Sequence, residues 1–387
     1  MSTSTQDKVV FDGVAVVLGS SPVRIWGMSS TERLRRQLLR TSVGDLRPDL
    51  ASATGAARVL LLRADWAYEQ RLIEALVESP DTVLLAPGSG MPIAANVGGA
   101  DAAAVAEALL NGAAGSLPAD HLRLVDPEGL GGNYNFKLRK REVGYVIPLT
   151  PQTLAEVENR TFAGSYKGVT DFVTKYVWPW PAKQVTRWCA ERGITPNQVT
   201  LTGLVCVFIA FGLFWTGHYG FGLVFAWIMT FLDTVDGKLA RVTMNYSRTG
   251  DILDHGIDLI HPPFWWWAWV VGLGAAGHAD TWLTASTMIA IIFIGYIAQR
   301  VEEGIFSYLF GMHMHVWRRF DSFFRLITAR RNPNLVILTL FTLIGEPGLG
   351  MEIVVWWIVI CFFVHLSQIV QALVASRRQP ITSWLSA

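Results

Sequence analysis

The stretch FLDTVDGKLARVTMNYSRTGDILDHGID, residues 231–258, places a group of acidic side chains where the surrounding sequence is strongly apolar. It follows thirty-four residues, Val199 to Leu232, that contain no Asp, Glu, Lys or Arg. Apolar runs of about 20 residues are typical of membrane spans, so carboxylates at this point of the chain need a physical explanation. The stretch has the pattern D-x2-D-G-x2-A-R-x8-G-x3-D-x3-D, whose members are Asp233, Asp236, Gly237, Ala240, Arg241, Gly250, Asp254 and Asp258.

The spacing of this pattern predicts two acidic helix faces that meet. Side chains three and four residues apart share one face of a helix, and the short segment from Val242 to Gly250 allows a tight reversal between two helices. Converging carboxylates in a partly dry site repel one another unless a cation neutralises them. Oxygen ligands select hard cations, so we expect a pair of Mg²⁺ or Mn²⁺ ions. The expected metal ligands are Asp233, Asp236, Asp254 and Asp258.

The remaining members of the pattern favour a phosphate-bearing ligand. Gly237 and Ala240 have almost no side chain, which leaves room for a nucleotide close to the helix backbone. Arg241 can donate several hydrogen bonds to phosphate. In the alternative interpretation Lys238, Arg241 and Arg248 simply neutralise the acids, but three basic residues do not balance five acidic ones.

Hydropathy and charge predict the membrane topology. Six spans are expected, at roughly 199–217, 219–240, 255–276, 281–299, 333–350 and 353–375. Lys and Arg gather in alternate connections, and positive charge stays on the cytoplasmic side, so both termini and the aspartates are expected there, in a bacterial inner membrane. Trp178, Trp180 and Trp188 lie among basic residues and suit an interfacial helix. The aromatic run HPPFWWWAW, 261–269, is expected to form a membrane aromatic belt.

The first 150 residues have a different pattern, in which short apolar runs alternate with helical ones. Strands are expected at 14–19, 57–65, 81–87 and 142–149, and helices at 31–40, 68–78 and 101–112. Such alternation predicts an α/β domain with a mostly parallel sheet. The expected organisation is a cytoplasmic α/β domain at 1–150, a connector with the interfacial helix at 151–193 and an all-α membrane domain at 194–380. A formal net charge of +1 gives no reason to expect a nucleic acid as partner.

All eight positions of the pattern match the motif of the CDP-alcohol phosphotransferases, which this chain resembles from about 170 to 378. ITPNQVT, 194–200, resembles the Pro-Asn-x-x-Thr element before the first membrane helix of that family. The resemblance implies an integral membrane enzyme with six transmembrane helices, usually a homodimer. In such an enzyme a divalent-metal site binds the CDP pyrophosphate, an alcohol attacks the β-phosphate and CMP leaves. It also implies that Asp258 is both ligand and general base, and that the CMP part contacts Asn197, Thr200, Gly237, Ala240, Arg241 and Gly250.

The resemblance leaves the substrates open. Asp254-His255-Gly256 resembles a sequence of choline and ethanolamine phosphotransferases, which favours a CDP-linked headgroup as donor and a lipid as acceptor. The alternative is CDP-diacylglycerol with a soluble alcohol such as inositol, serine or glycerol phosphate. Residues expected to contact substrate or support the site are Asp251, His255, Arg325, Arg330 and Arg331. His313 and His315 do not share a helical face and are set aside as metal ligands. A divalent-cation transporter is a distant alternative that uses the same carboxylates.

The N-terminal domain resembles a sugar-phosphate nucleotidyltransferase in two places. A strand ends in Leu18-Gly19-Ser20-Ser21, as in the opening loop of that family, and LLLRAD resembles the strand that ends in the family's metal-binding Asp, here Asp65. The Pro-Lys pair of that loop is missing. We therefore expect a nucleotidyltransferase-like domain that serves as a scaffold or regulator. The fused arrangement resembles bifunctional enzymes that make CDP-inositol and then transfer its inositol phosphate.

Overall fold

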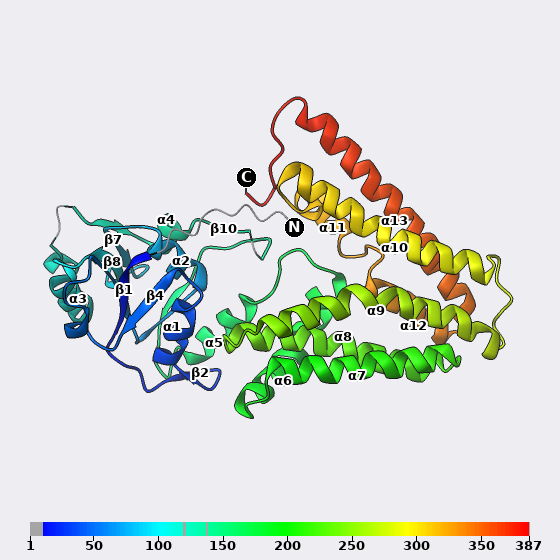
Figure 1. The fold of residues 1–387 in the computed structure, drawn as a ribbon, viewed down its shortest axis with the longest axis horizontal. Coiled ribbons are helices and arrows are strands. Elements are labelled where there is room, and N and C mark those ends of the chain that lie inside the picture. The colour runs from blue at the N-terminus through cyan, green and yellow to red at the C-terminus, as the bar shows by residue number, and fades with distance from the viewer. Residues whose placement is uncertain (1–10, 119–120, 137, 387) are drawn as a thin grey trace. The chain divides into compact units, whose positions relative to one another are not determined.

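The computed structural model describes residues 11–118, 121–136 and 138–386, apart from the side chains of Arg248, Thr249 and Asp251. The chain divides into two compact units, which are described separately (Figure 1). The N-terminal unit comprises Met1–Phe136, Arg141–Ser165 and Val242–Met244. The helical unit comprises Lys137–Lys140, Tyr166–Arg241 and Asn245–Ala387.

The N-terminal unit is built on a six-stranded sheet with strand order β4-β1-β5-β8-β7-β9. The strands are β1 (Phe11–Leu18), β4 (Val43–Arg47), β5 (Arg58–Arg63), β7 (Thr82–Leu85), β8 (Pro92–Gly98) and β9 (Arg123–Val125). Strand β8 runs antiparallel to both of its neighbours, whereas the other pairings are parallel. The α/β class is therefore confirmed, and the sheet is mixed. The unpredicted strand β8, PIAANVG, is rich in small residues, which are weak strand signals, but it is buried almost throughout.

Helices cover both faces of this sheet because the central strand β5 is buried on both sides. Leu60 and Leu62 pack with α1 (Ser30–Leu38) and α2 (Gln70–Val77), whereas Val59 and Leu61 pack with α3 (Ala102–Asn111). Such two-sided burial explains the continuous apolar run of β5.

The segment 142–149 and Asp65 are two predicted features of this unit that lie outside the main sheet and its helices. The segment predicted as a strand at 142–149 forms only β12 (Val146–Pro148), which pairs with β6 (Trp66–Tyr68) outside the main sheet. The Asp65 carboxylate is paired with Arg63 at 2.6 Å. Asp65, the proposed metal ligand of the N-terminal unit, is thus engaged in an ion pair, and the scaffold role of this unit stays a prediction.

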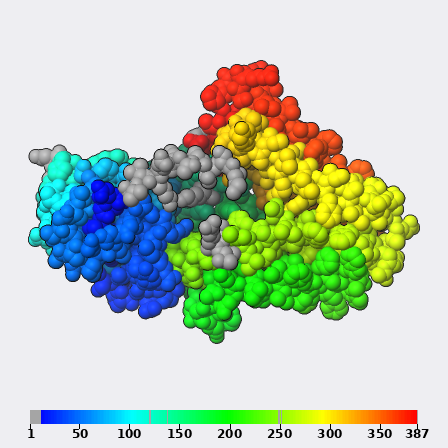
Figure 2. Space-filling model, in the orientation of Figure 1, coloured from blue at the N-terminus to red at the C-terminus, as the bar shows by residue number. Residues whose placement is uncertain are grey.

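The helical unit consists mainly of long helices (Figure 1). They are α6 (Pro179–Glu191), α7 (Pro196–Trp215), α8 (Tyr219–Val242), α9 (Arg248–Ala275), α10 (Ala285–Phe310), α11 (Arg319–Phe324), α12 (Arg331–Leu343) and α13 (Pro347–Ser376). Helix α13, red in Figure 2, packs along α10, which is yellow there.

Within the described residues, α7, α8 and α13 are long and apolar enough to cross a membrane. Helices α9 and α10 have 28 and 26 residues, so length alone would let them span a bilayer. Helix α12 has only 13 residues, and the fifth predicted span is interrupted where α13 begins at Pro347. Proline suits the first turn of a helix and cannot continue α12. Three apolar spans are thus supported, and the six-span arrangement stays a proposal.

Three of the four tryptophans expected to form a membrane belt instead lie in the core of the helical unit, whereas Trp267 is half-buried. Trp265, Trp266 and Trp269 are at most 2% exposed. The Trp265 Nε1–H donates to the Val207 carbonyl at 3.0 Å, and the Trp269 Nε1–H donates to the Pro347 carbonyl at 3.2 Å. Because each of these two indole donors finds a backbone acceptor, the rings can join α9 to α7 and α13 without an unsatisfied polar group.

Close packing of α7 on α9 depends on Gly272. A Cβ atom at this position would lie 2.0 Å from the Phe214 carbonyl oxygen, whereas a Cβ at Gly274 on the same helix would meet nothing within 4 Å. We therefore expect Gly272→Ala to force the two backbones apart and to destabilise the protein by about 1–3 kcal/mol. Gly274→Ala, the matched control, removes a poor helix former and should keep or slightly raise stability. Thermal unfolding of the detergent-purified variants measures both, and equal midpoints would contradict this account of the packing.

Candidate active site

Three of the predicted aspartates converge where α8 ends and α9 begins. Asp233 and Asp236 come from α8 and Asp254 from α9, and each offers a carboxylate oxygen within 4.8 Å of the others. Residues 243–247 make the reversal between the two helices. The three carboxylates form a set of oxygen ligands of the kind that Mg²⁺ and Mn²⁺ prefer.

Asp236 is the most deeply placed of the three. Its Oδ2 atom accepts a hydrogen bond of 2.6 Å from the Thr200 hydroxyl of α7. Its Oδ1 atom is buried and has no hydrogen-bond partner among the described residues. A buried carboxylate oxygen without a partner is costly. A divalent cation would satisfy it, so the residues present fit the metal that the sequence pattern implies.

Asp258 is held by an arginine instead of joining this group of three. Arg331, the first residue of α12, donates from Nη1 to Asp258 Oδ1 and from Nη2 to Asp233 Oδ2, each at 2.5 Å. One guanidinium thereby bridges carboxylates from α8 and α9. This bridge lowers the repulsion between the two carboxylates, because the positive guanidinium pairs with both of them.

The turn that carries Asp258 has an unusual backbone. Pro262 and Pro263 lie inside α9. Because proline has no N–H, the carbonyl group four residues before each of them loses its normal helical donor. The Tyr296 hydroxyl from α10 donates to one of these carbonyls, that of Leu259, at 2.9 Å. Tyr296 thus stabilises the helix next to Asp258.

Asn197 and Gly250 form a tight joint at the start of α9. Ser247 caps this helix by accepting from the Gly250 N–H at 2.9 Å, and the Asn197 amide donates to the same hydroxyl at 3.1 Å. A Cβ at Gly250 would lie 2.2 Å from Asn197 Oδ1. A side chain at Gly250 would therefore displace the Asn197 amide and the Ser247 hydroxyl from the cap that they form.

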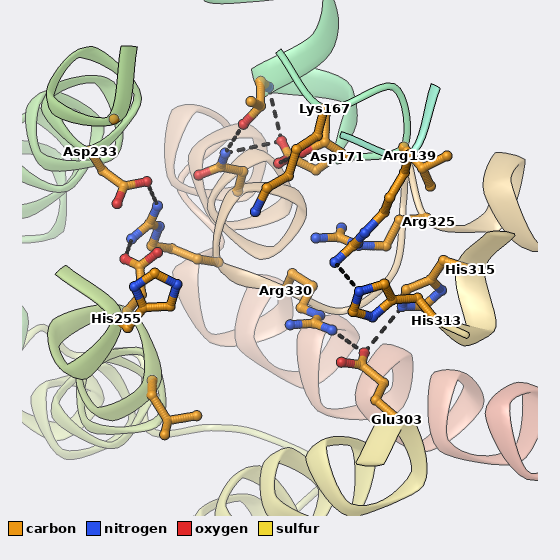
Figure 3. A pocket seen from close by; sticks show the side chains of 18 of the residues that line it. Arg139, Lys167, Asp171, Asp233, His255, Glu303, His313, His315, Arg325 and Arg330 are labelled. Atoms are coloured by element: carbon orange, nitrogen blue, oxygen red, sulfur yellow. Dashed lines mark hydrogen bonds and ion pairs between the residues drawn. The ribbon is translucent and has the colours of Figure 1, made fainter. Parts of the chain in front are cut away.

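A cavity of about 560 Å³ opens beside the aspartates (Figure 3). Its acidic side is lined by Asp233, Gly237, Arg241, Asp254, His255 and Asp258. A Cβ at Gly237 would contact only Arg241, at 3.6 Å, so the helix backbone is open to the cavity here. Asn197, Thr200, Ala240 and Gly250 are not among the lining residues. His255 is largely exposed, with Nδ1 4.0 Å from Asp254, and the side chain of Asp251 lies outside the described part of the chain.

The opposite side of the cavity is basic. It is lined by Arg139, Lys167, Arg300, His313, His315, Arg325 and Arg330, with Asp171 and Glu303 as acidic neighbours (Figure 3). Burial lowers the pKa of Lys167, and the nearby arginines lower it further. Arg325 Nη1 and Arg330 Nε are buried donors without a hydrogen-bond partner among the described residues. This half of the cavity therefore suits an anionic group.

Several residues of the basic side were not predicted. Arg139, Lys167 and Asp171 precede the membrane helices, and the sequence gives no spacing that joins them to the motif. The pair of histidines set aside as metal ligands does line the cavity, but the two rings contact different residues. Arg139 donates to His313 Nε2 at 3.2 Å, and burial lowers the pKa of His313 to about 4, which agrees with its role as an acceptor.

Comparison with known proteins finds similarity in the part of the chain that carries the group of three aspartates. The family model described as CDP-alcohol phosphatidyltransferase matches residues 193–318. Phosphatidylinositol phosphate synthase of Mycobacteroides abscessus is 33% identical over 121 residues, which are 29% of this chain and 52% of that protein. Cholinephosphotransferase 1 of Xenopus laevis is 29% identical over 161 residues, 38% of this chain and 37% of that protein.

The bifunctional IPC transferase and DIPP synthase of Rubrobacter xylanophilus is 24% identical over 206 residues, 52% of this chain and 43% of that protein. The chain thus spans about half or less of the length of each of these three relatives. The family match begins at residue 193, so the likeness of the N-terminal unit to nucleotidyltransferases stays a prediction. The match contains the eight motif positions and most of the acidic side of the cavity. Residues 193–318, less than half of the chain, therefore resemble a CDP-alcohol phosphatidyltransferase domain, and this likeness lies in the helical unit.

Proposed function

We propose that this protein is an integral membrane CDP-alcohol phosphotransferase, which transfers a phospho-alcohol or phosphatidyl group from a CDP-alcohol to an acceptor hydroxyl and releases CMP. The observation that carries the proposal is the group formed by Asp233, Asp236 and Asp254, with a buried unpartnered oxygen, beside a cavity that Arg241 also lines. Six spans, a cytoplasmic site and a homodimer are parts of the same proposal, and three apolar helices support the membrane location.

Each residue has a separate part in the proposed reaction. Asp233, Asp236 and Asp254 hold the divalent cation, which when bound would neutralise charge on the pyrophosphate. Asp258 lines the cavity and accepts the proton of the attacking hydroxyl. The hydroxyl oxygen forms a bond to the β-phosphorus, and the bond from that phosphorus to the oxygen bridging it to CMP breaks. Arg241 binds the phosphates of the leaving group.

The basic side of the cavity favours an acceptor that carries a phosphate. Buried guanidinium donors of Arg325 and Arg330 have no partner among the described residues, and an anion would satisfy them. An acceptor of this kind is compatible with a CDP-linked headgroup as donor and also with CDP-diacylglycerol. A lipid acceptor with a phosphate in its headgroup and a soluble alcohol phosphate both offer a phosphate to these arginines. An assay with lipid and soluble acceptors distinguishes them.

The purified protein should release CMP from a CDP-alcohol only when Mg²⁺ or Mn²⁺ is present, and EDTA should abolish release. The assay pairs a panel of CDP-alcohols, including CDP-headgroups and CDP-diacylglycerol, with lipid and soluble acceptors, each tested with and without its phosphate. We expect Asp258→Asn to lower the rate by about 100-fold or more, because the proton of the hydroxyl then has no acceptor. CMP release and product mass are measured together.

The matched control is Asp280→Asn, which makes the same change at an exposed aspartate outside the cavity lining. Asp258→Asn acting at the wild-type rate would rule out Asp258 as the base. Metal flux into proteoliposomes without CMP release from any donor would instead support the transporter alternative.

The bridging role of Arg331 can be tested by stability. In EDTA, Arg331→Gln removes the charge shared by Asp233 and Asp258, and we expect the unfolding midpoint to fall by a few degrees, for a loss of about 1–2 kcal/mol. Mg²⁺ should raise the midpoint of Arg331→Gln more than that of the wild type, because the cation is then the main compensation for the carboxylates. Arg377→Gln, at an exposed residue just beyond α13, is the control. An equal response of all three proteins to Mg²⁺ would refute the bridge as a source of stability.

A further inference from the structure

Arg330 is held at the basic side of the cavity by a carboxylate from α10. Glu303 Oε1 pairs with an Nη2 donor of Arg330, and Glu303 Oε2 lies 3.5 Å from Arg300 (Figure 3). Arg330 and Glu303 both line the cavity. Only one donor of the Arg330 guanidinium is used in this pair, and its Nε is buried with no partner among the described residues.

His315 shares the carboxylate oxygen that Arg330 uses. Its Nε2 atom lies 3.2 Å from Glu303 Oε1, and the side chain is buried. Because an ionised carboxylate can only accept hydrogen bonds, Nε2 must carry the proton. Burial also lowers the pKa of His315, which agrees with a neutral imidazole that donates from Nε2.

Arg330 and His315 share Glu303 Oε1, and this limits how many hydrogen bonds Arg330 can make to the carboxylate. A carboxylate and a guanidinium left to themselves form a two-pronged pair, with two donors on two oxygens. The His315 donor occupies part of Oε1, while Arg300 lies beside Oε2. Glu303 therefore holds Arg330 by one donor, and Nε of this cavity-lining guanidinium has no partner among the described residues.

His315 is itself fixed by its surroundings. It lies in the short 3₁₀ turn Met314–Val316, and its carbonyl accepts from the Ser322 hydroxyl at 2.7 Å. The segment after α13 folds back onto this turn, where the Ser383 hydroxyl donates to the Val316 carbonyl at 2.7 Å. The ring of His365 packs against His315 with centroids 5.5 Å apart. The two hydrogen bonds hold the backbone of the turn, and the His365 ring packs against the imidazole that reaches Glu303.

We propose that His315 is a positioning residue for acceptor binding: by engaging Glu303 it keeps the free donors of Arg330 directed at the phosphate of the acceptor. The inference rests on the proposed function, since it assigns a residue to the anion side of the same cavity. His315 does not touch the reacting atoms, so it governs the affinity for the acceptor and leaves the chemical step almost unchanged.

The test compares His315→Leu with His315→Gln in the CMP-release assay, using the phosphate-bearing acceptor and the same alcohol without phosphate. Leucine fills the space but has no donor, whereas the glutamine amide places an N–H near the position of Nε2. For the phosphate-bearing acceptor we expect His315→Leu to raise KM about tenfold or more with kcat within about threefold of wild type, and His315→Gln to restore most of the affinity. KM for the donor and for the alcohol without phosphate should not change.

His218→Leu makes the same change at an exposed histidine between α7 and α8 and should behave as wild type. If His315→Leu does not fold, His315→Asn replaces it, since the shorter amide cannot reach Glu303. The inference would be overturned if His315→Leu and the wild type had equal KM values for the phosphate-bearing acceptor, or if His315→Leu lowered only kcat. Equal changes of KM for both acceptors, or a KM of His315→Gln as high as that of His315→Leu, would overturn it as well. A wild-type protein that releases no CMP with any pair of substrates would instead overturn the proposed function.

Discussion

The arrangement of the helical unit depends on bringing carboxylates from two helices together in a largely buried place. Asp233 and Asp236 of α8 face Asp254 of α9, and such a group repels itself unless positive charge lies beside it. Arg331 supplies part of that charge by bridging Asp233 and Asp258. Because Arg331 begins α12, the ion pairs also connect a third helix to the acidic site.

The same requirement gives the cavity its two chemically different sides. Its acidic wall suits a divalent cation and the phosphates of a nucleotide, and its basic wall suits a second anionic group. The acidic wall contains motif residues, whereas the residues of the basic wall lie outside the motif. Arg325 and Arg330 of the basic wall lie beyond the segment that the family model matches.

Local sequence signals predicted the three aspartates that converge and the α/β class of the N-terminal unit, but not that Arg331 holds Asp258. The i, i+3 and i, i+4 spacing of the motif places its members on two helix faces, and alternation of apolar runs indicates an α/β unit. Local sequence signals gave wrong or missing predictions where tertiary packing decided the structure of a segment. Strand β8 is rich in small residues with little strand propensity, and Trp265 and Trp269 satisfy their indole donors inside the protein, where both side chains are buried.

The sequence by itself indicated which residues offer oxygen ligands to a cation, because ligand chemistry and helical spacing are local properties. Only the tertiary structure decided what stands opposite them, since that depends on contacts between segments far apart in the chain. It put Arg331 between Asp233 and Asp258, and it placed His315 against Glu303, although the sequence offered only a pair of histidines with no helical face in common. Charge complementarity across a cavity is a property of three-dimensional packing, and no spacing within one helix encodes it.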